Sequence, residues 1–209
     1  MEWLRNHKLP VLGIVLLAAA ISWINWPAAD AAYPSREGVS PVMVSTTAAA
    51  PQYALHILFI GNSFTFYHAI PKQLVDIASS DPGNPTQFTV QSVTLAGITL
   101  KELWNDGKAA AAIRSRRWDY VVLQEVSSWA LMPQWVLQTM DYGKRFNTLI
   151  TQDGARTLLY MTWVNKPGSH WYTDPEFSYA RNPDYMLRTF ITQTYRLADK
   201  LGAMPVDVG

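Results

Sequence analysis

One run of apolar residues constrains the fold of this chain more than any other feature. It extends from Leu55 to Ile60, consists largely of branched side chains, and ends abruptly at Gly61-Asn62-Ser63. An apolar run of this length, interrupted here only by His56, is typical of a strand buried on both faces, as strands of parallel sheets are. Residues 69–78 then carry apolar side chains at helical spacing. The sequence therefore predicts a buried strand, a tight glycine turn and a helix.

Ser63 stands where this strand ends and the helical region begins. Ligands of open α/β sheets bind beyond the carboxyl ends of the strands, and the N–H groups at a helix start can hold an anion. Ser63 is therefore placed as a nucleophile would be, with its own N–H available to a developing oxyanion. The alternative interpretation of Asn62-Ser63 is ordinary turn and helix N-cap chemistry.

Strand-like and helix-like segments alternate from Tyr53 onward. Thr99 and Glu102 have the spacing of a capping box at the start of the second long helix. Besides the segments already described, we predict strands at 88–95, 119–124, 157–163 and from 204, helices at 99–113, 134–152 and 187–201, and a long loop at 164–182. This order predicts an α/β domain at residues 53–209 with a three-layer αβα fold, a flavodoxin-like doubly wound parallel sheet of about five strands.

The N-terminal region has the pattern of an export signal. No charged residue occurs from Leu9 to Ala29, and Ala29-Asp30-Ala31 offers small residues at the positions that a signal peptidase reads. We predict a secretory signal in residues 1–32, cleaved near Ala31 or Ala32. The alternative is an uncleaved membrane anchor through residues 9–29, since the uncharged run approaches the length that spans a bilayer.

Both interpretations of the N-terminal region place the domain outside the cytoplasm, in a secreted or periplasmic location. A membrane would then be a partner only through the N-terminal segment, if that segment stays uncleaved. Residues 33–52 are rich in Pro, Ser, Thr and Ala and show no sustained periodicity, so they predict a disordered linker.

The composition excludes several classes of function. The net charge is +1, and charges of both signs are interspersed along the chain. Because there is no basic stripe, we expect no nucleic-acid partner. Cysteine is absent, which excludes a disulfide framework, a thiolate metal site and a cysteine nucleophile.

Three predicted strand ends carry the residues on which the chemistry depends. Gly61-Asn62-Ser63 follows the first strand, Gly97 follows the second and precedes the capped helix, and Gln124-Glu125 follows the third. In this order the chain resembles an SGNH (GDSL-type) hydrolase over roughly residues 55–209. That family places a nucleophilic serine, an oxyanion glycine and an oxyanion amide after these three strands. The resemblance implies Ser63 as the nucleophile, Gly97 and Gln124 as oxyanion donors, and no metal or organic cofactor.

The chain departs from the family's pattern after the third strand. Gln124-Glu125 replaces the usual Gly-x-Asn-Asp, so the amide role falls to Gln124 by position and chemistry, because an amide N–H can donate to an oxyanion. The alternative for Gln124 is a buried amide that ties strand ends together. Glu125 is interpreted as a structural hydrogen-bond acceptor rather than a catalytic acid.

The second departure concerns the base. A serine hydroxyl is a weak nucleophile until an adjacent base takes its proton, and the family's Asp-x-x-His pair is absent from the sequence. The histidines are His7, His56, His68 and His170, and none is assigned as the base. We expect the native protein to continue beyond Gly209 into the missing pair, and residues 1–209 alone to hydrolyse esters poorly or not at all.

The sequence thus predicts an exported serine esterase of SGNH type that acts on a small-molecule or carbohydrate ester. Carbohydrate acetyl esters fit the predicted export and the aromatic content. The alternative is a non-catalytic carbohydrate-binding or surface module on the same fold, whose contact surface would comprise Trp129, Trp135, Trp163, Trp171 and Tyr172. A flavodoxin-like cofactor binder is disfavoured, because the first turn lacks the run of donors that cradles a phosphate.

Overall fold

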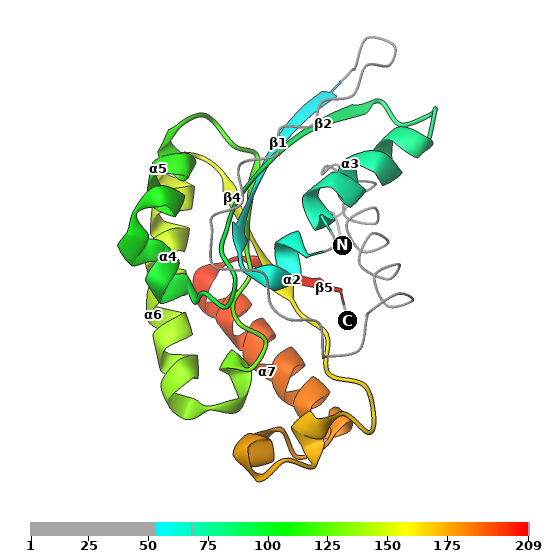
Figure 1. The fold of residues 1–209 in the computed structure, drawn as a ribbon. Helices are drawn as coiled ribbons and strands as arrows, with labels where there is room; N and C mark the ends of the chain where they lie inside the picture. The colour runs from blue at the N-terminus through cyan, green and yellow to red at the C-terminus, as the bar shows by residue number, and fades with distance from the viewer. Residues whose placement is uncertain (1–52, 68, 209) are drawn as a thin grey trace.

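A computed structural model describes residues 53–67 and 69–208 as a parallel sheet with helices on both faces (Figure 1). The predicted signal and linker lie outside the described residues. The five strands follow the order β2-β1-β3-β4-β5, and every neighbouring pair is parallel. They are β1 (Tyr53–Gly61), β2 (Thr86–Thr94), β3 (Tyr120–Leu123), β4 (Arg156–Met161) and β5 (Met204–Asp207). This order is that of a flavodoxin-like doubly wound sheet, which confirms the predicted fold class.

Helices form a layer on each side of the sheet. The short α2 (Ser63–Phe66) and α3 (Ile70–Ser80) lie on one face. The opposite face is covered by α4 (Leu100–Asp106), α5 (Lys108–Arg114), α6 (Pro133–Gln152) and α7 (Pro183–Leu201). The 3₁₀ helices are η2 (Trp129–Leu131), η3 (His170–Tyr172) and η4 (Pro175–Ala180).

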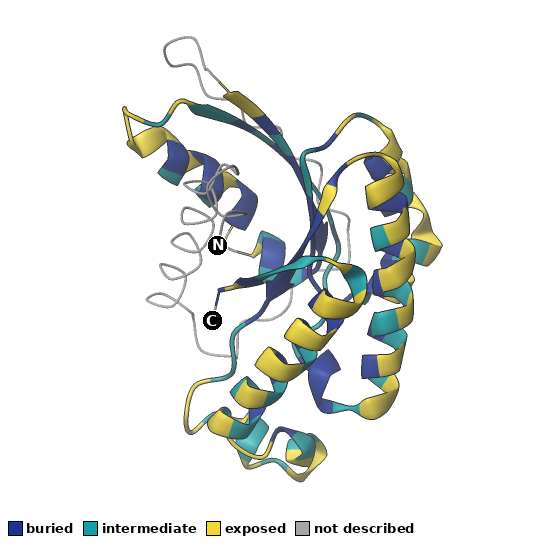
Figure 2. Ribbon diagram, turned by 180° about the vertical axis from the view of Figure 1, so that it is seen from behind, coloured by how far each residue is buried: buried dark blue, intermediate teal, exposed yellow. Residues whose placement is uncertain are grey.

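The packing of β1 shows why apolar residues occupy successive positions from Ile57 to Ile60. Leu58 and Ile60 belong to the core beneath α4 to α7, whereas Leu55, Ile57 and Phe59 belong to the core on the α3 side. Both cores are buried between the sheet and the inner faces of its helices, whose outer faces are exposed (Figure 2). Because apolar layers cover both sides of β1, an alternation of polar and apolar residues would place polar groups in a core.

Three details of the predicted secondary structure were wrong. The helix predicted at 99–113 is two helices, because Gly107 adopts a left-handed φ of 78° and its N–H closes α4 on the Trp104 carbonyl. The loop predicted at 164–182 contains η3 and η4. The turn after β1 does not lead directly into the predicted helix, since the short α2 precedes α3.

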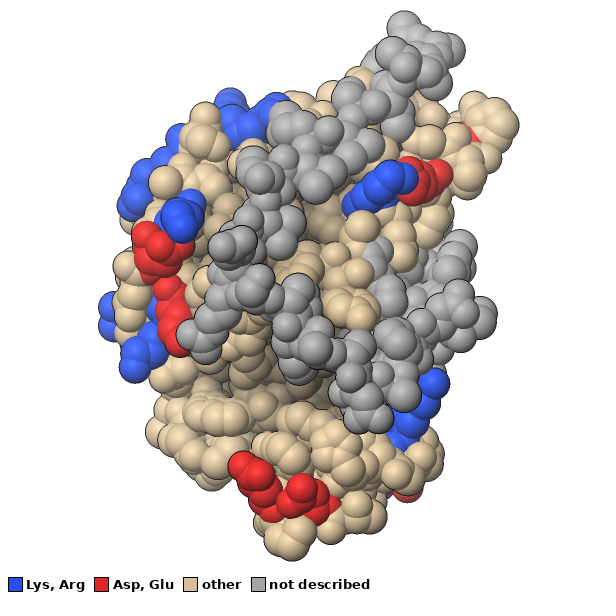
Figure 3. Space-filling model, in the orientation of Figure 1, with Lys and Arg blue, Asp and Glu red and all other residues tan. Residues whose placement is uncertain are grey.

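The described surface mixes charges of both signs. On the face shown in Figure 3, basic and acidic side chains alternate over the helices, and Lys72 pairs with Asp76 along α3. No helix within residues 53–67 and 69–208 is both long enough and apolar enough to cross a membrane.

Candidate active site

Ser63 is the first residue of α2, at the carboxyl end of β1. The helix begins here because Asn62 has extended backbone angles and its side-chain oxygen accepts the Phe64 N–H at 3.2 Å. Asn62 is buried, whereas Ser63 is half-buried. Within the described part of the chain, neither the Ser63 N–H nor its Oγ makes a hydrogen bond. Both groups are therefore free of competing contacts among these residues.

Gly97 occupies the loop between β2 and α4, and the surroundings show why a glycine stands there. Its φ is +62°, a left-handed conformation that other residues rarely adopt. A Cβ at this position would meet no atom within 4 Å, so the requirement is conformational rather than spatial. Gly97 is exposed, and its N–H makes no hydrogen bond to another described residue.

The loops that carry the three predicted residues meet at Asn62. The Asn62 Nδ2 donates to the Ile98 carbonyl at 3.1 Å, and the Leu95 N–H donates to the Gly61 carbonyl at 3.3 Å. These two bonds hold the Gly97 loop on both sides against the end of β1. On the other side, the Asn62 N–H donates to Gln124 Oε1 at 2.8 Å. The structure therefore brings together the loops after β1, β2 and β3.

Gln124 is fully buried, and its side-chain amide is engaged with the protein. Its Oε1 accepts the Asn62 N–H and also the Thr65 hydroxyl at 3.0 Å, while its Nε2 donates to the Glu125 carbonyl. An amide with no exposed surface has no access to a substrate oxygen in this arrangement. These contacts are those expected of a buried amide that joins strand ends, the alternative given for Gln124 above. The oxyanion role of Gln124 stays a prediction.

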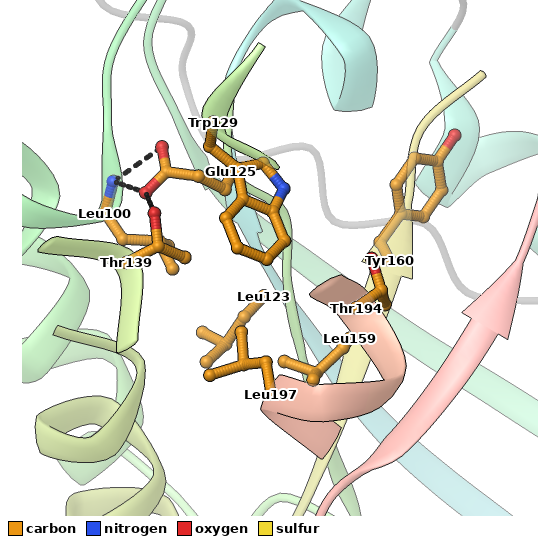
Figure 4. Close-up of a pocket in the computed structure, with 9 residues that line it drawn as sticks. All are labelled: Leu100, Leu123, Glu125, Trp129, Thr139, Leu159, Tyr160, Thr194 and Leu197. Atoms are coloured by element: carbon orange, nitrogen blue, oxygen red, sulfur yellow. Dashed lines mark hydrogen bonds between the residues drawn. The ribbon is translucent and has the colours of Figure 1, made fainter. Parts of the chain in front are cut away.

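Glu125 joins three elements through a buried carboxylate. Its oxygens accept the N–H groups of Leu100 and Val126, at 3.2 and 2.8 Å, and the Thr139 hydroxyl at 3.2 Å. Figure 4 shows the carboxylate directed at Leu100 and Thr139, beside a small pocket bordered by Trp129. Burial raises the pKa of Glu125 to about 7, despite the opposing effect of its hydrogen bonds. The interpretation of Glu125 as a structural acceptor agrees with these contacts.

Aromatic side chains gather after β4, at the same edge of the sheet as Ser63. Trp163 contacts Phe64, the neighbour of Ser63, with ring centroids 5.0 Å apart. Farther along, Trp171 stacks on Phe177 at 4.3 Å, and His170 meets Phe177 edge-on at 5.8 Å. The segment between β4 and α7 therefore presents a cluster of aromatic rings.

One residue of the contact surface predicted for a sugar-binding module is buried. Trp129 is buried in the core beneath α6 and α7 with 8% of its surface exposed, so its inclusion was wrong. Tyr172 is half-buried, and its hydroxyl donates to the Asn165 carbonyl at 2.7 Å.

None of the described histidines contacts Ser63. His56 lies in β1, where its backbone N–H donates to Asp119 Oδ2 at 2.8 Å and its buried Nδ1 has no hydrogen-bond partner among residues 53–67 and 69–208. His170 packs on Trp171 and Phe177 instead. His68 lies outside the described residues.

Asn62 caps α2, as the N-cap interpretation of Asn62-Ser63 expected, because its side-chain oxygen accepts the Phe64 N–H. A second role of Asn62 was not predicted. Through its side chain and its backbone N–H it links the neighbouring loops. The bonds to Ile98 and Gln124, however, join residues far apart in the sequence, and no local pattern indicates them.

Comparisons with known proteins agree with this architecture. No family model and no curated protein matches the chain. Among solved structures, a protein from Slackia heliotrinireducens that its description proposes to be an SGNH hydrolase matches with a TM-score of 0.58 and 22% identity, over 74% of this chain and 79% of that one. A DUF4886 family protein from Bacteroides uniformis matches with a TM-score of 0.51 and 14% identity, over 72% and 65%.

A third structure, described as an acetyl xylan esterase, matches with a TM-score of 0.50 and 12% identity, over 74% of this chain and 77% of that one. At these identities the likeness concerns the fold. The chain therefore has the fold of SGNH hydrolases, as its sequence indicated.

Proposed function

We propose that this protein is a serine esterase in which Ser63 is the nucleophile. One observation carries the proposal. Ser63 begins a helix at the carboxyl end of β1, and its N–H and that of Gly97 are unpaired among the described residues on two loops that Asn62 holds together. Unpaired, preorganised N–H donors beside a serine hydroxyl are what acyl transfer requires.

The proposed reaction proceeds through an acyl-enzyme. The Ser63 Oγ attacks the ester carbonyl carbon and loses its proton to a general base, and the carbonyl oxygen becomes an oxyanion held by the N–H groups of Ser63 and Gly97. The C–O bond to the alcohol then breaks, and the alcohol leaves with a proton. Water attacks the acyl-serine in the same way, which releases the acid and restores the hydroxyl.

In this mechanism the supporting loops position the oxyanion donors. In comparable enzymes, loss of one oxyanion donor costs about 3–4 kcal/mol of transition-state stabilisation. We assign Gln124 to the support of Asn62, because its carbonyl oxygen accepts the Asn62 N–H and its amide is buried. This assignment replaces the donor role that the resemblance implies.

The base is not among the described contacts of Ser63. For this reason we propose that residues 1–209 alone turn over esters slowly or not at all, and the assays below use the full-length protein as its host expresses it. Measuring p-nitrophenyl acetate hydrolysis by residues 1–209 tests this. A rapid, Ser63-dependent rate from residues 1–209 would show that these residues contain their own base.

The nucleophile is tested with a matched pair of serine variants. In the full-length protein, Ser63→Ala is expected to lower the rate of p-nitrophenyl acetate hydrolysis by about 10³ or more, the scale on which loss of a nucleophile acts. Ser178→Ala, which alters an exposed serine on η4, is the control and is expected to stay within about twofold of the wild type. Equal rates in Ser63→Ala and the wild type would refute the assignment.

We propose acetyl esters of carbohydrates as the substrate class. The rings of His170, Trp171 and Phe177 lie in the segment between β4 and α7, which follows the carboxyl end of β4, and flat aromatic surfaces suit sugar rings. A structure similar to this chain is described as an acetyl xylan esterase. Comparing acetate release from acetylated xylan by the wild type and Trp171→Ala tests this class, with p-nitrophenyl acetate as the reference. Equal loss on both substrates would contradict a sugar-specific role for Trp171.

The aromatic cluster also favours a second candidate, a non-catalytic carbohydrate-binding module. In that case the full-length protein would bind acetylated or plain oligosaccharide while Ser63 stayed unreactive towards a fluorophosphonate.

For the location we retain the proposal of export. N-terminal sequencing of the mature protein should begin near Ala31 or Ala32, or at Met1 in a membrane fraction if the segment is an uncleaved anchor.

A further inference from the structure

Glu125 is a buried carboxylate that the proposed chemistry does not use. It has 6% of its surface exposed, and none of the ion pairs among the described residues includes it. Removing a carboxylate from water without a cationic partner is costly unless hydrogen bonds replace the lost hydration. The hydrogen bonds of Glu125 therefore indicate the role of this side chain.

The contacts of Glu125 converge on the start of α4. Both carboxylate oxygens lie 3.2 Å from the N–H of Leu100, the first residue of that helix. The remaining bonds come from Val126 in its own loop and from Thr139 on α6. A carboxylate offers four lone-pair sites, enough to accept all of these donors, whereas a single amide oxygen offers two.

The start of α4 in turn fixes the loop that carries Gly97. This loop runs from Leu95, which is bonded to Gly61, through Ile98, which is bonded to Asn62, to Leu100 on Glu125. Each of these three anchors is a hydrogen bond between this segment and a neighbouring element or loop. A small pocket lies beside Glu125 and is bordered by Leu100, Trp129 and Thr139 (Figure 4).

We propose that Glu125 is a positioning residue: through Leu100 it holds the Gly97 loop in register with Ser63 and so sets the oxyanion donor. The inference rests on the proposed esterase function. It assigns no contact with substrate to Glu125. The effect of a change at Glu125 is therefore expected in kcat, because the donor matters most when charge develops on the substrate oxygen.

The test compares Glu125→Gln with Thr139→Val and Asp141→Asn in the full-length protein at pH 8. Asp141 is an exposed carboxylate on the same helix as Thr139 and pairs with Arg145, so its variant is the charge control. Initial rates with p-nitrophenyl acetate are divided by the amount of Ser63 that a fluorophosphonate titrates, which removes any loss of folded protein from kcat.

We expect Glu125→Gln to lower kcat at least fivefold with KM within threefold, Thr139→Val to lower kcat at least twofold, and Asp141→Asn to leave both unchanged. Any other pattern for Glu125→Gln overturns the inference, and if that variant does not fold, Thr139→Val decides by its own threshold. A wild type that neither hydrolyses the ester nor labels at Ser63 would refute the esterase function instead, so the two failures are distinguishable.

Discussion

Replacing Gly61 by alanine tests the packing that joins β1 to β3. A Cβ built on Gly61 would lie 2.6 Å from Gln124 Oε1, 2.7 Å from Thr65 Oγ1 and 2.9 Å from Gln124 Cβ. Contacts this short force Gln124 to move, and with it the acceptor of the Asn62 N–H. Gly61 is thus required for space, in contrast to Gly97, which is required for its backbone angle.

The size of the effect follows from two costs and one gain. Overpacking costs about 1–3 kcal/mol, and leaving the buried partners of Gln124 unsatisfied costs about 1–3 kcal/mol more. Replacing glycine by alanine returns at most about 1 kcal/mol by restricting the unfolded chain. We therefore expect Gly61→Ala to lower the free energy of unfolding by about 3 kcal/mol.

The assay is urea denaturation followed by tryptophan fluorescence, with Gly143→Ala as the matched control. A Cβ on Gly143 in α6 would meet Leu197 Cδ1 at 3.5 Å, an ordinary contact, so that variant is expected to gain about 0.5–1 kcal/mol from helix propensity. A free energy of unfolding for Gly61→Ala within about 0.5 kcal/mol of the wild type would refute the reasoning.

Three further predictions concern stability. The pKa of Glu125 rises from 4.5 to about 7 on folding, so its contribution is fully present below pH 4.5 and is lost as the pH rises through 7; denaturation across this range should show a loss of about 3 kcal/mol in the wild type that is absent from Glu125→Gln. Thr99→Ala removes the acceptor for the Glu102 N–H and should cost about 1 kcal/mol in a urea melt, whereas an unchanged midpoint would show that the capping box contributes nothing. Tyr160→Phe deletes a buried hydroxyl without a partner in the described part of the chain, so its thermal midpoint should stay equal or rise, and a clear fall would reveal a missing partner.

Periodicity was enough to predict the sheet. The apolar run in β1 and the alternation of later segments indicate which residues face the cores, and right-handed connections restrict the possible orders of the strands. The capping box at Thr99 was also predicted, because both of its residues are local in sequence. The break at Gly107 was missed, since a single glycine can be tolerated within a helix as well as end one.

The candidate site could be predicted only in part. The sequence places Ser63 and Gly97 at strand ends, and the structure places their loops together. It does not reveal that the Gln124 amide faces Asn62 and Thr65, because those partners lie 62 and 59 residues away along the chain. An amide at a strand end has the same local sequence whether it points at a substrate or into the protein, and only tertiary contacts decide between them.

The nucleophilic role of Ser63 is tested most directly by mass spectrometry of the full-length protein after treatment with a fluorophosphonate. We expect a single adduct on the peptide that contains Ser63, lost in Ser63→Ala and retained in Ser178→Ala. An unlabelled protein, or an adduct that persists in Ser63→Ala, would contradict it.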